Sequence, residues 1–455
     1  MTTRITTLGR IIVGTVLLLV LGLVLFFPRF EGTPPEVVTA PELAIGEPGR
    51  TLVVELADHG AGLRSVELRL LHQAGTRRIL EKRYPGSWFS WGGVRTDLLE
   101  VPLNPKELGV PDGPATLVLI TRDRALRDSF RGNRNETTIA LRVDTKPPDL
   151  ELESGLTYVY RGGSAAAVYR VDEAVERDGV QVEDHFFSGY ALGSADPAGG
   201  GKRVALFAIP VDAPADPSVE VVAIDLAGNR STARFPTHLL ERQFSNKEVT
   251  LPARFLATVV PRLARENGVQ DADQLAAFRE INTELRSQNE STIRELTSQT
   301  SAQTRWRGAF QQMQNSAVTS RFAENRTYVV AGQPVSRSRH FGFDLASTAK
   351  AQVVASNHGV VLFSGTLGIY GKSVLLDHGL GLTTLYGHLS SLAVEAGDEV
   401  AQGETLGRSG ATGLAGGDHL HFAILVGGTY VDPLEWWDPE WVRTHIEARI
   451  NPGAR

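Results

Sequence analysis

Short runs in which apolar and polar residues alternate dominate the first half of the chain and limit the folds that it can adopt. Between residue 51 and about residue 143 these runs include LVVEL, SVELRLL, ATLVLI and TIALRV, separated by clusters of Gly, Pro and Asp. Alternation with a period of two places successive side chains on opposite faces of a β-strand. Several such strands with turn residues between them are typical of a β-sandwich. We therefore expect a mainly β protein in which residues 51–147 form a first β-sandwich module.

A second stretch, residues 148–240, repeats this organisation after the two successive prolines of DTKPP (144–148), which cannot lie inside a central strand. The ends of the two stretches match each other: a strand, Asp123 and then Gly132-Asn133 in the first, and a strand, Asp225 and then Gly228-Asn229 in the second. The sequences DTKPP and IDLAGN resemble bacterial immunoglobulin-like domains. The resemblance implies a second β-sandwich module, and both modules would serve as spacers or as docking sites for other envelope proteins.

An apolar run near the N-terminus interrupts the soluble pattern. Ile11 to Phe27 (IIVGTVLLLVLGLVLFF) carries no charge, follows Arg4 and Arg10, and has about the length needed to cross the hydrocarbon layer. It is longer than the apolar region of a cleavable signal peptide. Residues 1–30 are therefore expected to be a cytoplasmic stub and a transmembrane signal anchor, and the Pro- and Glu-rich residues 31–50 a tether.

Residues 241–317 differ from the β-rich stretches and are expected to be helical. Leu275, Phe278, Ile281 and Leu285 recur at helical spacing, and charged residues fill much of the remaining face. Asp271 begins a sequence that resembles a helix N-cap. Two interpretations stay open: a helical hairpin packed on its neighbours, or a cover that controls access to the site described next.

Composition excludes sites built from cysteine and argues against a nucleic-acid partner. The chain has no Cys, which excludes disulfides and thiolate ligands for a metal. Its formal net charge is -6, so it has no global positive field that would attract nucleic acid, and we expect no nucleic-acid partner.

The chemistry is expected in a Gly-rich segment that holds three spaced motifs. They are His340-Phe-Gly-Phe-Asp344, Tyr386-Gly-His388 and His419-Leu-His421. In a strand, residues i and i+2 point to the same side, so His419 and His421 can both approach one centre. A catalytic zinc ion takes three protein ligands, which His340, Asp344 and one histidine of the last motif would supply.

Two histidines are then left for proton transfer. The HExxH motif, in which a glutamate is the general base, is absent from the sequence. A neutral histidine can accept a proton and a protonated one can steady a developing oxyanion.

These motifs resemble the LytM/lysostaphin-type peptidoglycan metalloendopeptidases. The resemblance runs through SRHFGFDLA, GKSVLLDHGLGLTTLYGHLS, VEAGDEVAQGETLGRSGATG and GGDHLHFAI, in the family's order. It implies a β-sheet peptidase domain at residues 318–435, followed by a tail at residues 436–455. It also implies one Zn²⁺ per chain bound by His340, Asp344 and His421, with His388 and His419 as the catalytic histidines. The substrates would be the peptides of peptidoglycan.

The sequence as a whole predicts a zinc endopeptidase held by its N-terminal helix in the cytoplasmic (inner) membrane. A single-pass anchor would leave the bulk of the chain in the periplasm or cell-envelope space. The alternative is a catalytically silent or autoinhibited regulator that binds peptidoglycan or activates another cell-wall hydrolase. A third possibility is a scaffold built mainly from the β modules, since sandwiches carry many functions.

Overall fold

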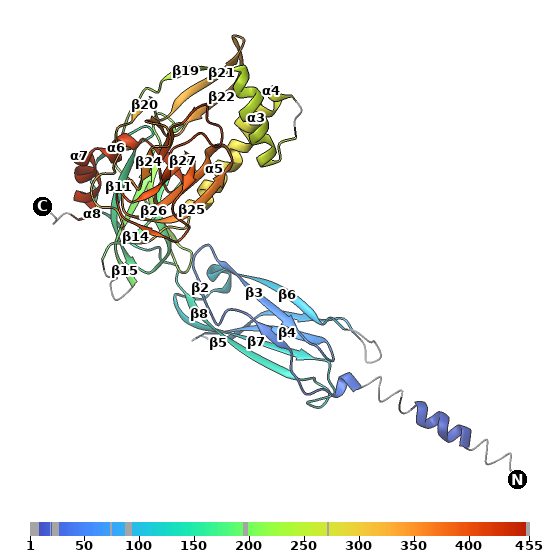
Figure 1. Cartoon of the computed structure of the whole chain (residues 1–455). Helices are drawn as coiled ribbons and strands as arrows, with labels where there is room; N and C mark the ends of the chain where they lie inside the picture. The colour runs from blue at the N-terminus through green and yellow to red at the C-terminus, as the bar shows by residue number, and fades with distance from the viewer. Residues whose placement is uncertain are drawn as a thin grey trace. The chain divides into compact units, whose positions relative to one another are not determined.

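The computed structural model describes residues 9–18, 20, 27–72, 75–86, 93–193, 199–270 and 273–451. The protein is mainly β, as predicted, and divides into two compact units. The first comprises Met1–Pro147 with Ile224–Asn229, and the second Pro148–Ala223 with Arg230–Arg455. Figure 1 labels the elements of both.

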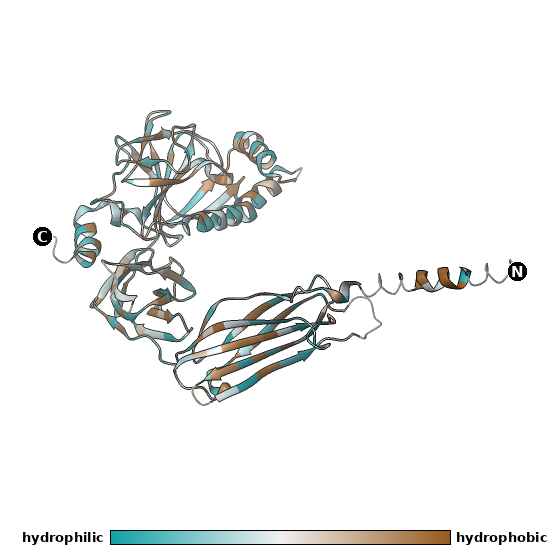
Figure 2. Ribbon diagram, turned by 90° about the horizontal axis from the view of Figure 1, so that it is seen from below, coloured by the Kyte–Doolittle hydropathy of each residue, from teal (hydrophilic) through white to brown (hydrophobic). Residues whose placement is uncertain are grey.

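The first unit contains two sheets that share one core. Along β3, side chains are alternately buried and exposed, as the period of two predicts, and Figure 2 shows apolar and polar stretches alternating along these strands. Leu52, Leu68 and Ile139 come from different strands and belong to the same buried cluster. One sheet has the order β1-β3-β6 (Glu36–Val38, Arg50–Ala57, Thr96–Leu103), and the other β2-β8-β7-β4-β5 (Glu42–Ile45, Arg134–Val143, Gly113–Asp123, Leu63–His72, Gly75–Arg83).

Residues 31–50, expected to be a tether, contain two strands of these sheets. β1 pairs with β3, and β2 pairs in parallel with β8, where Ile45 is fully buried. The partner of β2 lies about a hundred residues downstream, so local periodicity could not reveal the pairing. Short helical turns complete the unit: η1 (Phe27–Phe30) and α2 (Pro105–Leu108).

The predicted membrane anchor lies partly outside the described residues, because residues 1–8, 19 and 21–26 are not among them. Residues 9–18 are helical. Within the part of the chain that the structure describes, no helix combines the length and the hydropathy needed to span a membrane.

The repeated Asp and Gly-Asn positions form the same local structure twice. The Asp123 carboxylate accepts hydrogen bonds from the backbone and side-chain nitrogens of Asn133, and Asp225 accepts the equivalent pair from Asn229. The preceding glycines both have positive φ angles, which glycine adopts without steric cost. The sequence similarity of these two turns therefore reflects a shared hydrogen-bonded turn.

The second unit begins with three further sheets, the last of them parallel. Their orders are β14-β15-β11-β9 (Tyr190–Ala191, Gly199–Ala208, Ser164–Glu173, Leu150–Leu152), β13-β12-β16-β17 (His185–Ser188, Val175–Val182, Val219–Asp225, Arg230–Arg234) and β10-β18 (Thr157–Tyr160, Thr237–Leu240).

A larger sheet in the same unit carries the histidine motifs. Its order is β20-β23-β31-β27-β26-β25-β29 (Ala317–Ser320, Phe343–Ala346, Leu420–Val426, Leu382–Leu389, Gly371–Gly379, Gly359–Leu367, Glu399–Val400), with β32 (Thr429–Val431) paired to β31. Smaller sheets beside it are β24-β30-β28 (Gln352–Val354, Thr405–Arg408, Ser391–Leu392) and β19-β21-β22 (Asn246–Thr250, Glu324–Val330, Gln333–His340).

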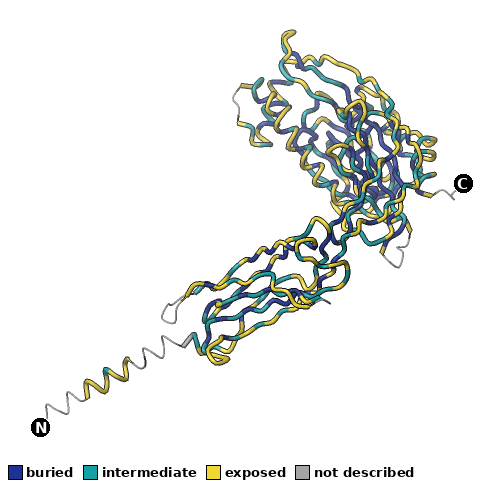
Figure 3. Tube along the Cα trace, turned by 180° about the vertical axis from the view of Figure 1, so that it is seen from behind, coloured by how far each residue is buried: buried dark blue, intermediate teal, exposed yellow. Residues whose placement is uncertain are grey.

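One buried core joins the residues of the predicted second module to this larger sheet. Phe207 of β15 belongs to the same cluster as Phe343 and Phe422 of the sheet. Figure 3 shows the buried interior of the unit in dark blue. The two stretches share a core in this structure and belong to one compact unit. Their division into a second module and a peptidase domain therefore stays a prediction.

The helices lie between residues 253 and 297, a narrower range than the expected 241–317. They are α3 (Ala253–Asn267), α4 (Gln274–Glu280), η2 (Ile281–Leu285) and α5 (Arg286–Thr297). Asp273 caps α4 by accepting hydrogen bonds from two backbone amides, whereas Asp271 lies outside the described residues. The residues before them form β19, which pairs in parallel with β21 some eighty residues downstream.

The helices are packed on the sheet rather than detached from it. Phe278 is fully buried and its ring lies 5.2 Å from that of Tyr328 in β21, in an edge-to-face arrangement. Asn289 Oδ1 accepts a hydrogen bond of 2.8 Å from the Ile369 amide in η3 (Gly368–Tyr370). These contacts favour the hairpin interpretation.

Residues 436–451, expected to belong to a tail, form short helices with buried side chains. Trp436, Val442 and Ile446 are fully buried, and Trp436 Nε1 donates a hydrogen bond to Ser164 Oγ in β11. The stretches of apolar residues here are too short and irregular for the sequence to predict helices. They are α6 (Pro433–Trp437), α7 (Pro439–Trp441), η4 (Val442–Glu447) and α8 (Ala448–Ile450).

Candidate metal centre and active site

Strand pairing brings the residues of two motifs face to face. β23 and β31 are antiparallel neighbours, and their register places Asp344 directly opposite His421. His340 is the last residue of β22 and lies four residues before Asp344, across the turn of the HxGxD motif. Pairing within the sheet thus brings the first and last motifs together, although they are far apart in the sequence.

The side chains of His340, Asp344 and His421 converge on one point. His340 Nε2 lies 3.0 Å from both Asp344 Oδ1 and His421 Nδ1, and His421 Nδ1 lies 3.1 Å from Asp344 Oδ1. The three residues are between 4% and 8% exposed. They are one of the groups of described residues whose ligand atoms lie close enough together to hold a metal ion.

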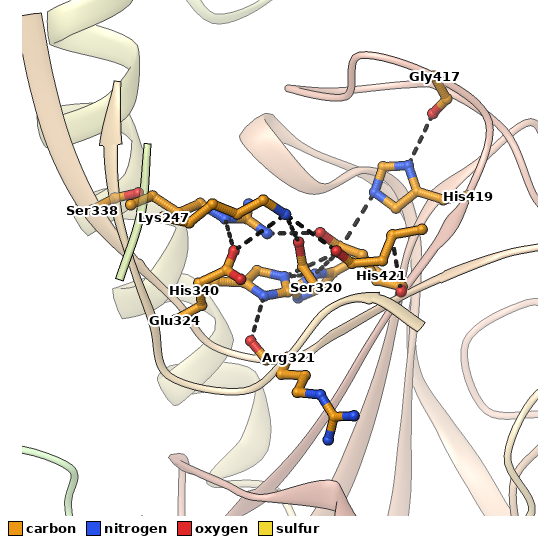
Figure 4. Close-up of polar contacts among 12 residues, drawn as sticks. Lys247, Ser320, Arg321, Glu324, Ser338, His340, Gly417, His419 and His421 are labelled. Atoms are coloured by element: carbon orange, nitrogen blue, oxygen red, sulfur yellow. Dashed lines mark hydrogen bonds and ion pairs between the residues drawn. The ribbon is translucent and has the colours of Figure 1, made fainter. Parts of the chain in front are cut away.

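Backbone carbonyl groups orient the rings of three of these histidines, His340, His388 and His419. His340 Nδ1 donates to the Arg321 carbonyl oxygen at 3.0 Å, which leaves Nε2 as the atom without a proton (Figure 4). His388 Nδ1 donates to Thr412 O at 2.8 Å, and His419 Nδ1 to Gly417 O at 2.9 Å. Their Nε2 atoms are therefore available for proton transfer or hydrogen bonding.

His388 and His419 lie beside the three converging residues. Their rings are 4.8 Å apart, and His419 Nε2 is 3.5 Å from Asp344 Oδ1. His388 has a φ angle of +63°, a left-handed conformation that is unusual for a residue with a Cβ. Strained conformations of this kind persist where the surrounding structure imposes them, and they concentrate at functional sites.

Gly342 explains the central glycine of the HxGxD motif. A Cβ atom at this position would lie 2.6 Å from the Phe422 carbonyl oxygen and 2.7 Å from His421 Cε1. Any side chain there would push His421 away from Asp344. The glycine is therefore required by close packing against a candidate ligand.

A charged network that the sequence motifs did not reveal holds the second oxygen of Asp344. Arg326 of β21 donates to Asp344 Oδ2 at 2.8 Å and to Glu324 Oε1 at 3.1 Å. Lys247 Nζ of β19 lies 3.9 Å from Glu324 Oε1 and 3.1 Å from Ser320 Oγ, as Figure 4 shows. No local pattern marks these residues, because they reach the site through pairing between distant strands.

The pKa values of this group shift in ways that suit a buried centre. Burial raises the pKa of Asp344, but the neighbouring histidines outweigh it and hold the pKa well below its usual range. Burial lowers the pKa of His421 to about 4 and holds that of His388 well below its ordinary value. Burial also lowers the pKa of His419, but its contact with Asp344 produces a net increase.

The five residues line a cavity of about 290 Å³, which we call the cleft. Its lining also includes four residues of the upstream segment, Lys247, Phe255, Phe278 and Arg286. The upstream residues therefore border the candidate site, although the sequence left their position open. The helical periodicity of the upstream segment predicted that one face of it is packed, but not which part of the protein it packs against.

Other histidines of the segment have structural roles. His378 is fully buried, with Nδ1 2.6 Å from His358 O and Nε2 2.8 Å from Thr384 Oγ1. Tyr386 is buried in β27 and accepts a hydrogen bond from the Ser356 amide. None of these residues lines the cleft.

The donor set fits a zinc ion. Two imidazole nitrogens and one carboxylate oxygen are donors that zinc accepts, and three protein ligands leave a position for water or substrate. The Arg321 carbonyl oxygen orients His340, and Arg326 orients Asp344. The ring of His421 packs closely against Gly342. That these residues bind zinc stays a prediction.

Comparison with known proteins identifies the region. Residues 338–433 match Peptidase family M23. The DD-carboxypeptidase/endopeptidase Mpg of Neisseria meningitidis serogroup B is 40% identical over 95 residues, which are 21% of this chain and 22% of the relative. The peptidoglycan DD-endopeptidase ShyA of Vibrio cholerae is 35% identical over 96 residues, again 21% and 22% of the two chains. The chain thus spans about a fifth of the length of these curated relatives.

Among solved structures, the catalytic domain of lysostaphin from Staphylococcus simulans is 26% identical, with a TM-score of 0.24. That match covers 28% of this chain and 96% of the lysostaphin domain. The family match contains all three histidine motifs. The C-terminal part of this chain is therefore a peptidase family M23 domain of the LytM/lysostaphin type.

Proposed function

We propose that the protein is a zinc-dependent endopeptidase that hydrolyses peptide bonds in the cross-links or stem peptides of bacterial peptidoglycan. The observation that carries the proposal is the convergence of His340 Nε2, Asp344 Oδ1 and His421 Nδ1, with two further histidines beside them. The relatives named as DD-endopeptidases support peptidoglycan as the substrate.

His340, Asp344 and His421 would hold the ion. Bound zinc supplies a Lewis acid for the scissile carbonyl and lowers the pKa of a water molecule. His388 is buried and largely neutral, so its Nε2 is suited to accept a proton from the attacking water. His419 Nε2 is suited to donate a hydrogen bond to the carbonyl oxygen as negative charge develops there. The carbonyl groups of Thr412 and Gly417 keep both rings in these orientations.

We also propose that the N-terminal segment anchors the protein in the inner membrane, with the peptidase domain in the periplasm. The support is the uncharged run from Ile11 to Phe27 after two arginines, and a substrate that lies outside the cytoplasm.

The alternative is a silent or autoinhibited regulator, and one observation bears on it. Residues of the upstream segment border the cleft, yet the cleft retains about 290 Å³ of space beside the candidate ligands. The convergence of His340, Asp344 and His421, with the rings of His388 and His419 4.8 Å apart beside them, supports hydrolysis. We therefore favour the active enzyme.

The test is the release of soluble muropeptides from purified peptidoglycan by the full-length chain, with and without a chelator. We expect release that the chelator abolishes, and mass spectrometry of the products would identify the bond that is cut. A zinc-loaded, folded chain that releases nothing would contradict hydrolysis and favour the regulator.

A further inference from the structure

One wall of the cleft is built outside the segment that matches the M23 family. Lys247 of β19, Phe255 of α3, Phe278 of α4 and Arg286 of α5 line the cleft but precede residue 338. The chemistry of this wall is therefore a property of this chain's upstream segment. It is a candidate determinant of which peptides can bind.

Three cationic side chains line the cleft, those of Lys247, Arg286 and Arg326. The only carboxylate among its described lining residues is the candidate ligand Asp344. Arg326 is already paired with Asp344 and Glu324, and Lys247 lies 3.9 Å from Glu324. Metal binding would add further positive charge to the same cleft.

Arg286 is the cation with donors to spare. Its guanidinium donates to the carbonyl oxygen and the side-chain Oδ1 of Asn282, at 3.3 Å and 2.9 Å. Within the described part of the chain, no carboxylate lies within 4.0 Å of it. Glu290 lies one turn further along α5, where burial raises the pKa of its carboxyl and the charges of Arg286 and Arg294 oppose that increase. A guanidinium has five N–H donors in a planar fork that fits a carboxylate, and Asn282 occupies only part of them.

Apolar side chains border the charged group. Leu251, Phe255, Phe278 and Ile369 also line the cleft, and Phe278 is fully buried. At about 290 Å³ the cleft is at the small end of ligand pockets, which span roughly 300–1,000 Å³. A short peptide segment with small apolar side chains and one free carboxylate matches these surroundings.

We propose that Arg286 binds a carboxylate of the substrate, so that the cleft selects anionic peptides. This inference rests on the proposed function and specifies its substrate class. The carboxylate is either the C-terminal carboxylate of a stem peptide or a carboxyl group within it, and both would meet the same guanidinium.

Three synthetic cross-linked peptides separate these cases with the zinc-loaded full-length chain. One has all carboxyl groups free, one has only its C-terminal carboxyl amidated, and one has only its internal carboxyl amidated. A hydrogen-bonded charge pair contributes about 1.5–3 kcal/mol, or roughly tenfold to a hundredfold in affinity. We expect kcat/KM to fall by about that factor for one amidated peptide, mainly through a higher KM.

We call the amidated peptide that the wild type hydrolyses slowly the sensitive peptide. The Arg286→Gln variant should hydrolyse the free peptide as slowly as the wild type hydrolyses the sensitive peptide. It should hydrolyse the sensitive peptide itself at the wild-type rate. Arg286→Lys should keep part of the preference, because it retains the charge but loses the fork. Arg265→Gln is the matched control, since Arg265 is an exposed arginine of α3 that does not line the cleft. Zinc stoichiometry should be equal in all four proteins.

Equal hydrolysis of all three peptides by the wild-type chain, or an undiminished preference in Arg286→Gln, would overturn the inference and leave the proposed function intact. No hydrolysis of any peptide by the wild-type chain would overturn the proposed function, and the inference with it.

Discussion

At the scale of single residues, each candidate ligand has a neighbour that limits its position. Arg321 O accepts a hydrogen bond from His340 Nδ1, Arg326 holds Asp344 Oδ2, and Gly342 leaves room for the His421 ring. His388 and His419 are oriented by carbonyl groups but contribute no atom to the converging set. Zinc binding and catalytic turnover should therefore depend on different residues.

The His340→Ala variant should lose zinc and hydrolysis together, because it removes one of three donors. His419→Ala should keep most of the zinc and lose about a hundredfold or more in kcat, the usual contribution of a hydrogen-bond donor that stabilises a developing oxyanion. Metal analysis and muropeptide release on the same samples check both. Retained turnover in His419→Ala would show that its assigned role is wrong.

Gly342→Ala should weaken zinc binding, because its Cβ would meet Phe422 O and the His421 ring at less than 3.0 Å. Gly155→Ala is the control, since a Cβ there has no neighbour within 4 Å. Zinc affinity is measured by competition with a chromophoric chelator. Equal affinities in the two variants would mean that the ring can move aside without consequence.

At the scale of elements, the upstream helices and β19 are integral parts of the peptidase unit. Their buried residues share a cluster with Leu375 and Leu385 of the main sheet. Removing them would expose this apolar face to water, so their deletion should destabilise the domain rather than simply uncover the cleft.

Asn289→Ala tests this attachment. Asn289 is buried, and its side chain accepts the Ile369 amide, so its loss leaves a buried donor without a partner. We expect a loss of about 1–3 kcal/mol in the free energy of unfolding. Gln288→Ala, at an exposed position of the same helix, should change it by less than about 0.5 kcal/mol. Equal effects measured by denaturant titration would contradict an integral role.

The elements also show how far the sequence could predict the structure. Alternation predicted the strands, and three short motifs predicted the five residues that meet at the centre. The pairing of β19 with β21, and the contact of Arg326 with Asp344, depend on the register of distant strands. Local periodicity carries no information about such pairing, so the cations of the upstream wall could not be predicted, although one of the two interpretations placed the helical segment over the site.

At the scale of the whole molecule, a buried carboxyl group joins the first β-rich part of the second unit to its C-terminal helices. Glu435 of α6 accepts a hydrogen bond from the Ser164 amide of β11 at 2.9 Å, and Arg242 lies 3.6 Å away. Burial raises its pKa from 4.5 to about 8. The folded state therefore keeps a proton that the unfolded chain releases at lower pH.

This linkage predicts a pH dependence of stability. The contribution of Glu435 is present below pH 4.5 and is lost as the pH rises through about 8. The melting temperature of Glu435→Gln, relative to that of the wild type, should therefore increase by roughly 2 °C or more between pH 5 and pH 9. A difference that is constant over this range, measured by calorimetry, would show that Glu435 ionises normally in the folded protein.

The most direct test of the central claim is a zinc titration of the chelator-treated full-length chain, with bound zinc and muropeptide release measured on each sample. The account predicts that release is absent without zinc, rises in proportion to bound zinc and reaches its maximum at one zinc per chain. Full release by the zinc-free chain, or one bound zinc per chain without any release, would contradict it.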